Sequence, residues 1–213
     1  RVTLDPLFRG EYPEKLLKTL RWFKPKIRQD DWDIITTPVD FLGVNNYTRE
    51  FAYHVWYIPL LHTWMTGGDI AETEYQDNGR HYTSMGWEVF PQSIYEVLMR
   101  LKNEYGNPVV YVTENGAAFD DKSPVDGSVN DKKRIQYLEG YLGKVDEAIK
   151  QGADVRGYFV WSLLDNFEWS VGFTKRFGIV HVDYESLERT IKDSGYWYRA
   201  VISSVKNRHN MGR

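Results

Sequence analysis

Val109-Val110-Tyr111-Val112-Thr113-Glu114-Asn115-Gly116 is the stretch that decides the fold of this 213-residue chain. Its branched and aromatic side chains predict a buried strand, which breaks into a glycine turn directly after a carboxylate. A charge at such a strand end costs desolvation free energy, and that cost is typically offset where the charge has a use. Glu114 is therefore a candidate catalytic residue, although a solvent-facing glutamate at a strand end would give the same pattern.

A second motif, Trp161-Ser162-Leu163-Leu164-Asp165-Asn166-Phe167-Glu168-Trp169, lies further along the chain. Together the two motifs resemble the family 1 glycoside hydrolases, the retaining β-glycosidases that share a (β/α)8 barrel. Further matching segments follow in the family's order, at residues 40–48, 85–91, 175–180 and 182–184. The resemblance thus covers nearly the whole chain.

The apolar periodicity alternates between helix and strand, which is typical of a parallel α/β sheet. Strands are predicted at residues 41–44, 109–114 and 157–161, and the last lacks alternation, as expected of a strand covered on both faces. Helices are predicted from Pro13, from Pro91 to Gly106, over about 131–151, and from about Ser194. Their expected apolar faces are Leu16, Leu17, Leu20 and Phe23; Ile94, Val97, Leu98 and Leu101; Ile135, Leu138, Leu142, Val145 and Ile149; and Tyr198, Val201, Ile202 and Val205.

The number of predicted strands limits the architectures that this chain can form by itself. A complete barrel needs eight strands and typically about 250 residues. A parallel sheet of three strands would leave two open edges and uncovered apolar helix faces. We therefore expect an α/β fold in which residues 1–213 are the C-terminal portion of a single (β/α)8 TIM barrel, with strands six to eight and their helices. The N-terminal part of the same barrel is the expected partner.

Composition excludes several classes of protein. With 27 basic and 30 acidic residues the net charge is −3, so a basic nucleic-acid-binding surface is not expected. The chain has no cysteine, which excludes disulfides and zinc thiolate sites. No run of about 18 apolar residues predicts a membrane span, and no signal-peptide pattern begins at Arg1. The cytoplasm is the expected location.

Metal and cofactor sites are not expected. The five histidines show no i, i+4 pairing on a helix, and Gly67-Gly68 lacks the strand-loop-helix context of a phosphate loop. Aromatic residues make up 15% of the chain, including 8 Trp and 15 Tyr, which is more than a core of this size needs. We expect some of these rings to line a groove and stack on sugar rings, although for any single ring core packing is the simpler interpretation.

The resemblance assigns the catalytic groups. Retaining hydrolysis uses two carboxyl groups about 5–5.5 Å apart, one as nucleophile and one as general acid and base. Glu114 matches the nucleophile, and Tyr47 matches a tyrosine whose hydroxyl hydrogen-bonds that carboxylate. The family's acid lies in an AsnGluPro segment that this chain does not contain. The second carboxylate is therefore expected in the N-terminal part of the barrel.

The resemblance also implies contacts to a β-glycoside or oligosaccharide. Glu168 matches the acceptor for the sugar 4- and 6-hydroxyls, and Trp169 matches a donor to the 3-hydroxyl. Trp161 matches a stacking platform beneath the sugar, and Phe177 matches an aromatic residue at the 6-hydroxyl side. Asn45 matches an amide near the nucleophile, and Trp87 matches a ring of the leaving-group subsite. A neutral glucoside, galactoside or fucoside is preferred over a 6-phosphoglycoside, because an ionised Glu168 would repel phosphate.

Two positions depart from the family pattern. Asn46 stands where a tyrosine is usual, and Tyr141 stands where histidine is frequent, so we expect altered packing or subsite polarity rather than lost chemistry. The segment 51–84 is far longer than the usual connection of about 2–6 residues. Its aromatic residues suggest a wall over the outer subsites; they include Trp56, Tyr57, Trp64 and Tyr75. The alternative function is a catalytically silent sugar-binding relative on the same barrel.

Overall fold

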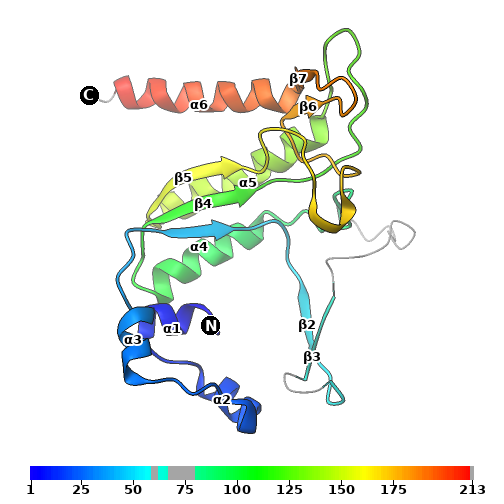
Figure 1. Ribbon diagram of the computed structural model, residues 1–213. Helices are drawn as coiled ribbons and strands as arrows, with labels where there is room; N and C mark the ends of the chain where they lie inside the picture. Colours follow the sequence, from blue (N-terminus) through cyan, green and yellow to red (C-terminus); the bar gives the residue numbers. More distant parts are fainter. Residues whose placement is uncertain (59–61, 67–79, 212–213) are drawn as a thin grey trace.

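The computed structural model describes residues 1–58, 62–66 and 80–211 of the chain. Its centre is a parallel sheet in the order β1-β4-β5, formed by Leu42–Asn45, Val110–Asn115 and Val155–Val160. Helices α4 (Gln92–Glu104) and α5 (Lys132–Lys150) connect these strands and cover the same face of the sheet (Figure 1). The predicted alternation of strand and helix is confirmed for this part of the chain.

The other elements surround this central unit. Before β1 lie α1 (Leu4–Arg9), α2 (Glu14–Leu20), the 3-10 helix η1 (Arg21–Phe23) and α3 (Gln29–Ile35). Between β1 and α4, strands β2 (Phe51–His54) and β3 (Thr63–Thr66) form an antiparallel hairpin. After β5 come the 3-10 helix η3 (Trp169–Val171), the antiparallel pair β6 (Val180–Val182) and β7 (Arg189–Ile191), and the long helix α6 (Asp193–Met211).

The core lies between the sheet and helices α4 and α5. Val110 and Val112 of β4 point into it and are at most 2% exposed, and the predicted Ile94, Leu98 and Leu101 face of α4 is equally buried. The inner face of α5 differs from its prediction. Leu138 and Val145 are buried there, but Ile149 is 44% exposed, and two tyrosines, Tyr137 and Tyr141, complete the face.

The sheet is covered on one face only, which corrects the prediction for the last strand. Phe159 of β5 is 55% exposed, and Thr113 of β4 is also exposed. Both point away from α4 and α5, because successive strand residues alternate between the two faces. In a closed barrel this second face lines the interior, and the strands that would close it lie outside this chain.

The first predicted helix is shorter than expected. It begins after Pro13 as α2, ends at Leu20, and none of its residues is buried. Phe23 lies beyond it in η1 and is 74% exposed. The apolar spacing therefore identified the helix but not its end, because Arg21 takes a left-handed backbone conformation with φ of 45°.

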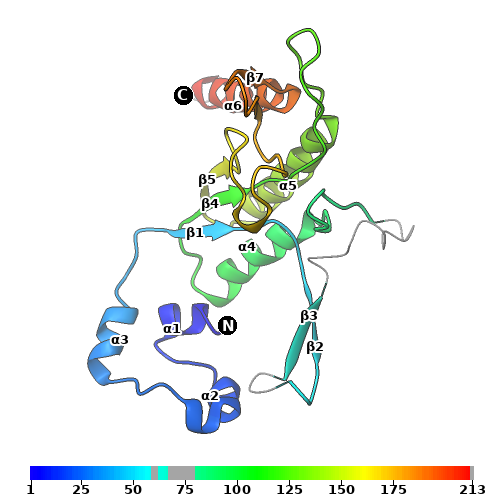
Figure 2. The same cartoon turned by 45° about the vertical axis from the view of Figure 1, so that its right-hand side comes forward.

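The long connection after β1 contains the β2–β3 hairpin, which stands away from the sheet (Figure 2). Trp56, Tyr57 and Trp64 are between 57% and 78% exposed. Tyr75, which was predicted to belong to the same aromatic wall, lies outside the described residues. The role of this segment at outer subsites stays a prediction, as does the assignment of residues 1–213 to one domain.

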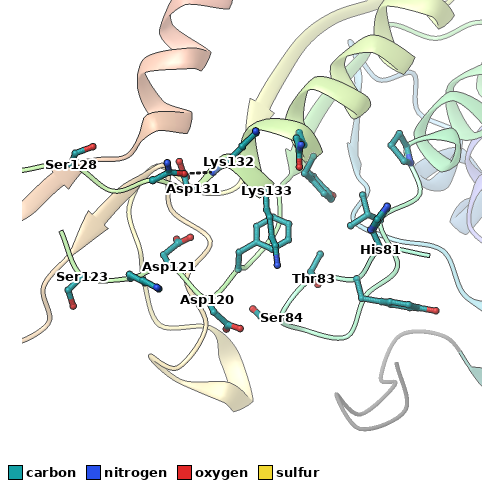
Figure 3. A pocket seen from close by; sticks show the side chains of 18 of the residues that line it. His81, Thr83, Ser84, Asp120, Asp121, Ser123, Ser128, Asp131, Lys132 and Lys133 are labelled. Carbon is teal, nitrogen blue, oxygen red and sulfur yellow. Dashed lines mark hydrogen bonds between the residues drawn. The ribbon is translucent and has the colours of Figure 1, made fainter. Parts of the chain in front are cut away.

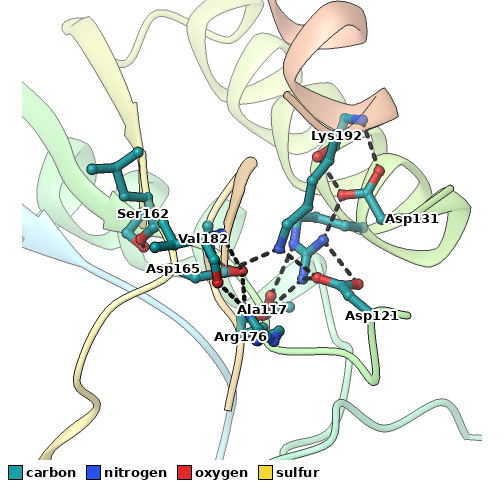
Figure 4. A network of polar contacts seen from close by, with 12 residues as sticks. Ala117, Asp121, Asp131, Ser162, Asp165, Arg176, Val182 and Lys192 are labelled. Carbon is teal, nitrogen blue, oxygen red and sulfur yellow. Dashed lines mark hydrogen bonds and ion pairs between the residues drawn. The ribbon is translucent and has the colours of Figure 1, made fainter. Parts of the chain in front are cut away.

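A buried ionic network ties the loops at the carboxyl ends of the strands together (Figure 4). Arg134 of α5, with a side chain only 1% exposed, forms ion pairs with Asp121 in the loop after β4 and with Asp131 at the start of α5. Lys192, fully buried before α6, pairs with Asp121 and with Asp165 in the loop after β5. Burial and the nearby Arg134 lower the pKa of Lys192.

The same network reaches the loop that contains the second motif. Asp165 accepts from Arg176 at 2.8 Å and from the main-chain N–H of Gly178 at 2.9 Å. Arg176, Arg134 and Lys192 thus balance three buried carboxylates. Because a buried charge without a partner is costly, these pairs specify one arrangement of the loops even where their net contribution to stability is small.

Arg134→Met tests this network. The variant leaves Asp131 without its ion-pair partner and Asp121 with Lys192 alone, so we expect a loss of about 3–5 kcal/mol in unfolding free energy. Chemical denaturation of the protein measures it. Arg156→Met is the matched control, since its ion pair with Asp154 lies at the surface. Equal midpoints for the two variants would contradict the structural role of the network.

Candidate active site

Glu114 lies at the carboxyl end of β4, half-buried, where it pairs in register with Asn45 of β1. The turn that follows it brings β4 and β5 unusually close. A Cβ atom added to Gly116 would lie 1.7 Å from the carbonyl oxygen of Trp161, so only glycine fits there. The N–H of Trp161 donates to the carbonyl of Asn115 at 2.9 Å and fixes this approach.

Tyr47 and Glu114 are joined directly. The hydroxyl of Tyr47 donates to Oε2 of Glu114 at 2.6 Å, across 67 positions of sequence. Burial, the hydrogen bond to Glu114, and the charges of Glu114 and Glu168 raise the pKa of Tyr47 well above its usual value. Tyr47 is therefore a neutral donor over the whole working pH range, and its hydrogen bond fixes the orientation of the carboxylate.

Two predicted aromatic residues pack against Tyr47. The ring of Trp87 lies 5.4 Å from that of Tyr47, and Phe177 lies 6.3 Å from Tyr47 and 6.0 Å from Trp87, measured between centroids. Phe177 is 2% exposed. Such tilted and edge-on contacts fix the orientation of the tyrosine ring. The structure thus brings Tyr47, Trp87 and Phe177 together, although their predicted contacts to a sugar stay predictions.

Asn45 and Trp161 border the carboxylate from the neighbouring strands. The amide oxygen of Asn45 accepts from the hydroxyl of Thr113 at 2.7 Å, and the residue stays exposed on the open face of the sheet. Trp161 is half-buried directly after β5, and its peptide bond to Ser162 is cis. Both residues are therefore at the strand ends that surround Glu114.

Glu168 and Trp169 are adjacent in sequence, but Glu168 is buried and Trp169 is exposed. Glu168 is 8% exposed, and its Oε2 is buried without a hydrogen-bond partner among the described residues. A buried carboxylate oxygen in that state costs about 1–3 kcal/mol or more, so it marks a position where a donor from outside the chain would be favourable. Trp169 begins η3 and is 85% exposed.

Several polar residues that support the site were not assigned from the motifs. The carboxylate of Glu88, a residue only 5% exposed, accepts hydrogen bonds from Nε and Nη2 of Arg49 at 2.8 and 3.0 Å, and its carbonyl accepts from the hydroxyl of Thr48. Tyr137 and Tyr141 of α5 reach the same region. Their spacing of four residues on an inward helix face was the available sequence signal, because buried tyrosine hydroxyls require partners.

A pocket of about 1340 Å³ opens beside the site, between the segment 80–84 and the loop after β4 (Figure 3). Most of its described lining residues are polar, among them His81, Thr83, Asp120 and Lys133. None of the predicted site residues lines it. The groups around Glu114 therefore form an open wall, in keeping with a barrel interior that this chain encloses only in part.

The described residues contain no group of three or more His, Asp or Glu side chains arranged to hold a metal ion. None of the helices in these residues combines the length and apolar character required to cross a bilayer.

The parallel strand order, the helices on one face and the polar groups gathered at the strands' carboxyl ends define a chain of the (β/α)8-barrel class, in which sites lie at that end. The chain belongs to glycosyl hydrolase family 1, whose model matches residues 1–207. It corresponds to the C-terminal part of the family's barrel, as predicted.

Similar proteins share this sequence over most of its length. Beta-glucosidase A of Thermotoga maritima is 44% identical over 201 residues, which are 94% of this chain and 43% of that protein. A bifunctional beta-D-glucosidase/beta-D-fucosidase of Bifidobacterium breve is 41% identical over 211 residues, or 95% of this chain and 46% of that protein. The chain thus spans less than half the length of these relatives.

Solved structures agree with the sequence relatives. A family 1 β-glucosidase from Thermotoga maritima superposes with a TM-score of 0.82 at 44% identity, covering 95% of this chain and 43% of that one. The same enzyme in complex with castanospermine gives a TM-score of 0.81 with the same coverage. The fold prediction, a C-terminal portion of a TIM barrel, is confirmed.

Gly116→Ala tests the close approach that places Glu114. The added methyl group would overlap the Trp161 carbonyl, so we expect a loss of about 1–3 kcal/mol in unfolding free energy from the forced backbone shift. Gly143→Ala is the control, because nothing lies within 4 Å of its Cβ position on α5. That change should stabilise the helix by about 0.5–1 kcal/mol. Thermal unfolding of both variants gives the comparison, and a neutral Gly116→Ala would contradict the close packing.

Proposed function

We propose that this chain is the C-terminal portion of a retaining β-glycosidase of the β-glucosidase type, which removes terminal β-linked glucosyl, galactosyl or fucosyl residues. The observation that supports it most is the hydrogen bond of 2.6 Å from Tyr47 to Glu114 at a strand's carboxyl end. A bond of this kind holds a carboxylate in one orientation, which a nucleophile requires. The beta-glucosidases to which the chain is similar support the same function.

The proposed reaction proceeds by two displacements. Glu114 attacks the anomeric carbon, the bond to the leaving oxygen breaks, and a carboxylic acid protonates that oxygen. The resulting carboxylate then takes a proton from water, which attacks the same carbon and releases Glu114. Both inversions together retain the β configuration. The acid and base group belongs to the N-terminal part of the barrel, which supplies the remaining wall of the site.

Within this chain the division of tasks follows from the geometry. Tyr47 engages Oε2 of Glu114, so Oε1 is the oxygen free to attack. Since the pKa of Tyr47 is raised, its proton stays on the phenol and does not transfer to the carboxylate. Trp87 and Phe177 hold the tyrosine ring, and Trp87 also borders the leaving-group side.

The sugar-binding groups are proposed from the resemblance to family 1 glycoside hydrolases, and burial and residue type support them. Glu168 has a buried oxygen without a donor, which a sugar hydroxyl would satisfy. We assign the 4- and 6-hydroxyls to it, and the 3-hydroxyl to the indole N–H of Trp169, whose exposed ring has room to meet a ligand. Trp161 supplies a stacking face and Asn45 an amide next to the nucleophile.

Trapping of the glycosyl-enzyme tests the nucleophile. A 2-fluoro-glucoside, added to the complete barrel formed by this chain and its N-terminal portion, should leave a stable sugar adduct on the peptide that contains Glu114. Glu114→Gln should abolish both the adduct and turnover with little change in fold, because the amide keeps size and an oxygen for Tyr47. Peptide mass spectrometry and hydrolysis of an aryl β-glucoside provide the readouts.

Glu185→Gln, which changes an exposed glutamate, is the control and should retain full turnover. The catalytically silent alternative predicts a folded barrel that binds sugar and forms no adduct. Near-normal turnover by Glu114→Gln would remove the nucleophile assignment.

Glu168→Gln tests the sugar contact separately. A charge-assisted hydrogen bond contributes about 1.5–3 kcal/mol, so the ratio of kcat/KM for glucoside over galactoside should change by about tenfold or more. The amide offers one acceptor where the carboxylate offers two, which weakens the discrimination of hydroxyl position. Aryl glucoside and aryl galactoside kinetics at one pH measure the ratio. An unchanged ratio would place the recognition of the 4-hydroxyl elsewhere.

A further inference from the structure

The segment 46–49, which contains Tyr47, has no regular secondary structure but is held at every residue. The N–H of Asn46 donates to the carbonyl of Glu114 at 3.0 Å. The hydroxyl of Thr48 donates to the Glu88 carbonyl at 3.0 Å, and Arg49 forms its bidentate pair with the Glu88 carboxylate. A loop fixed in this way keeps a functional side chain in place without a strand or helix around it.

The carbonyl of Tyr47 itself receives two tyrosine hydroxyls. Tyr137 donates to it at 3.1 Å and Tyr141 at 3.0 Å, which occupies both lone pairs of that oxygen. The two rings lie one turn apart on α5 and stack with centroids 4.3 Å apart and 23° between their planes. Both residues are at most 1% exposed. Burial raises the pKa of each phenol, so both hydroxyls remain neutral donors.

Tyr137 also contacts the strand that bears the nucleophile. Its hydroxyl accepts from the side-chain amide of Asn115 at 3.1 Å, and the same amide donates to the Asn46 carbonyl at 2.6 Å. Asn115 is fully buried and directly follows Glu114. The hydroxyl of Tyr137 thus contacts both partners of the Tyr47–Glu114 bond indirectly. It binds the main chain of the donor, Tyr47, and the side chain of Asn115, which follows the acceptor Glu114.

We propose that Tyr137 and Tyr141 are positioning residues that set the geometry of the Tyr47–Glu114 hydrogen bond from behind the site. Neither touches the carboxylate or the open wall where a sugar would lie. They act through the Tyr47 carbonyl, and Tyr137 acts also through Asn115. The inference rests on the proposed function, since the orientation of Glu114 matters to chemistry only if Glu114 is the nucleophile.

The two departures from the family pattern fall on this same contact set. Tyr141 donates to the Tyr47 carbonyl, and Asn46 accepts from the hydroxyl of Ser93 at 3.0 Å. Altered packing or subsite polarity is the prediction for both positions. In the structure each residue anchors the segment that contains Tyr47.

Inactivation kinetics with a 2-fluoro-glucoside test the proposal, because they separate binding (KI) from attack by Glu114 (kinact). In the complete barrel, Tyr137→Phe and Tyr141→Phe should each lower kinact about tenfold, as expected when one of the two hydrogen bonds to the Tyr47 carbonyl is lost. The double variant, with the carbonyl of Tyr47 released from α5, should lower it on the order of 100-fold, the cost of a misplacement of about 1 Å. KI should stay within about twofold, since no sugar contact changes.

Tyr105→Phe is the matched control. It also removes a buried phenol hydroxyl, which donates to Asp5 at 2.7 Å, but it lies after α4, at the end of the sheet opposite Glu114. Its thermal midpoint should fall, as those of the α5 variants do, while kinact stays unchanged. The single variants keep the test decisive even where the double variant does not fold.

Three outcomes would overturn the proposal. Single variants with unchanged kinact would show that the phenols do not position the pair. A fall in kinact that Tyr105→Phe reproduces would show that only stability is involved. A complete, unsubstituted barrel that forms no adduct on Glu114 would refute the proposed function itself, which distinguishes that failure from a failure of the positioning role alone.

Discussion

The hydrogen bond between Tyr47 and Glu114 is the interaction whose geometry the surrounding structure maintains. Its donor follows β1 and its acceptor ends β4, so its length depends on the register of two parallel strands. A carboxylate at that place would otherwise be half-buried with an incomplete set of partners, which is costly. The strand pairing, the glycine turn after Glu114 and the tyrosines of α5 all restrict the positions of the Tyr47 hydroxyl and the Glu114 carboxylate.

Two kinds of buried polar group maintain that restriction from different distances. Close to the bond, neutral amides and phenols satisfy one another, and none of these groups needs a counter-charge. Further out, Arg134 and Lys192 join loops that have little secondary structure. The amides and phenols of the inner layer therefore add no charge of their own beside Glu114, while the ionic outer layer fixes the loop that contains Glu168.

Much of the fold could be predicted from local pattern. Apolar spacing located α4, α5 and β4, because those elements bury one continuous face, as Ile94, Leu98 and Val112 do. The exposed Phe159 could not be predicted, since its surroundings depend on strands outside the chain. The site motifs predicted that Tyr47 would meet Glu114. They did not predict the roles of Glu88, Tyr137 and Tyr141, because such contacts join residues far apart in sequence, and only three-dimensional packing brings a helix phenol to a particular carbonyl.

Tyr47, Asn115 and the two tyrosines of α5, which restrain the proposed nucleophile, all lie in this chain, whereas the proton donor is assigned to the N-terminal part of the barrel. In the proposed reaction, attack and leaving-group departure thus depend on separate stretches of polypeptide. Sequence drift in the donor stretch would alter which aglycones are accepted without disturbing the alignment of the attacking oxygen.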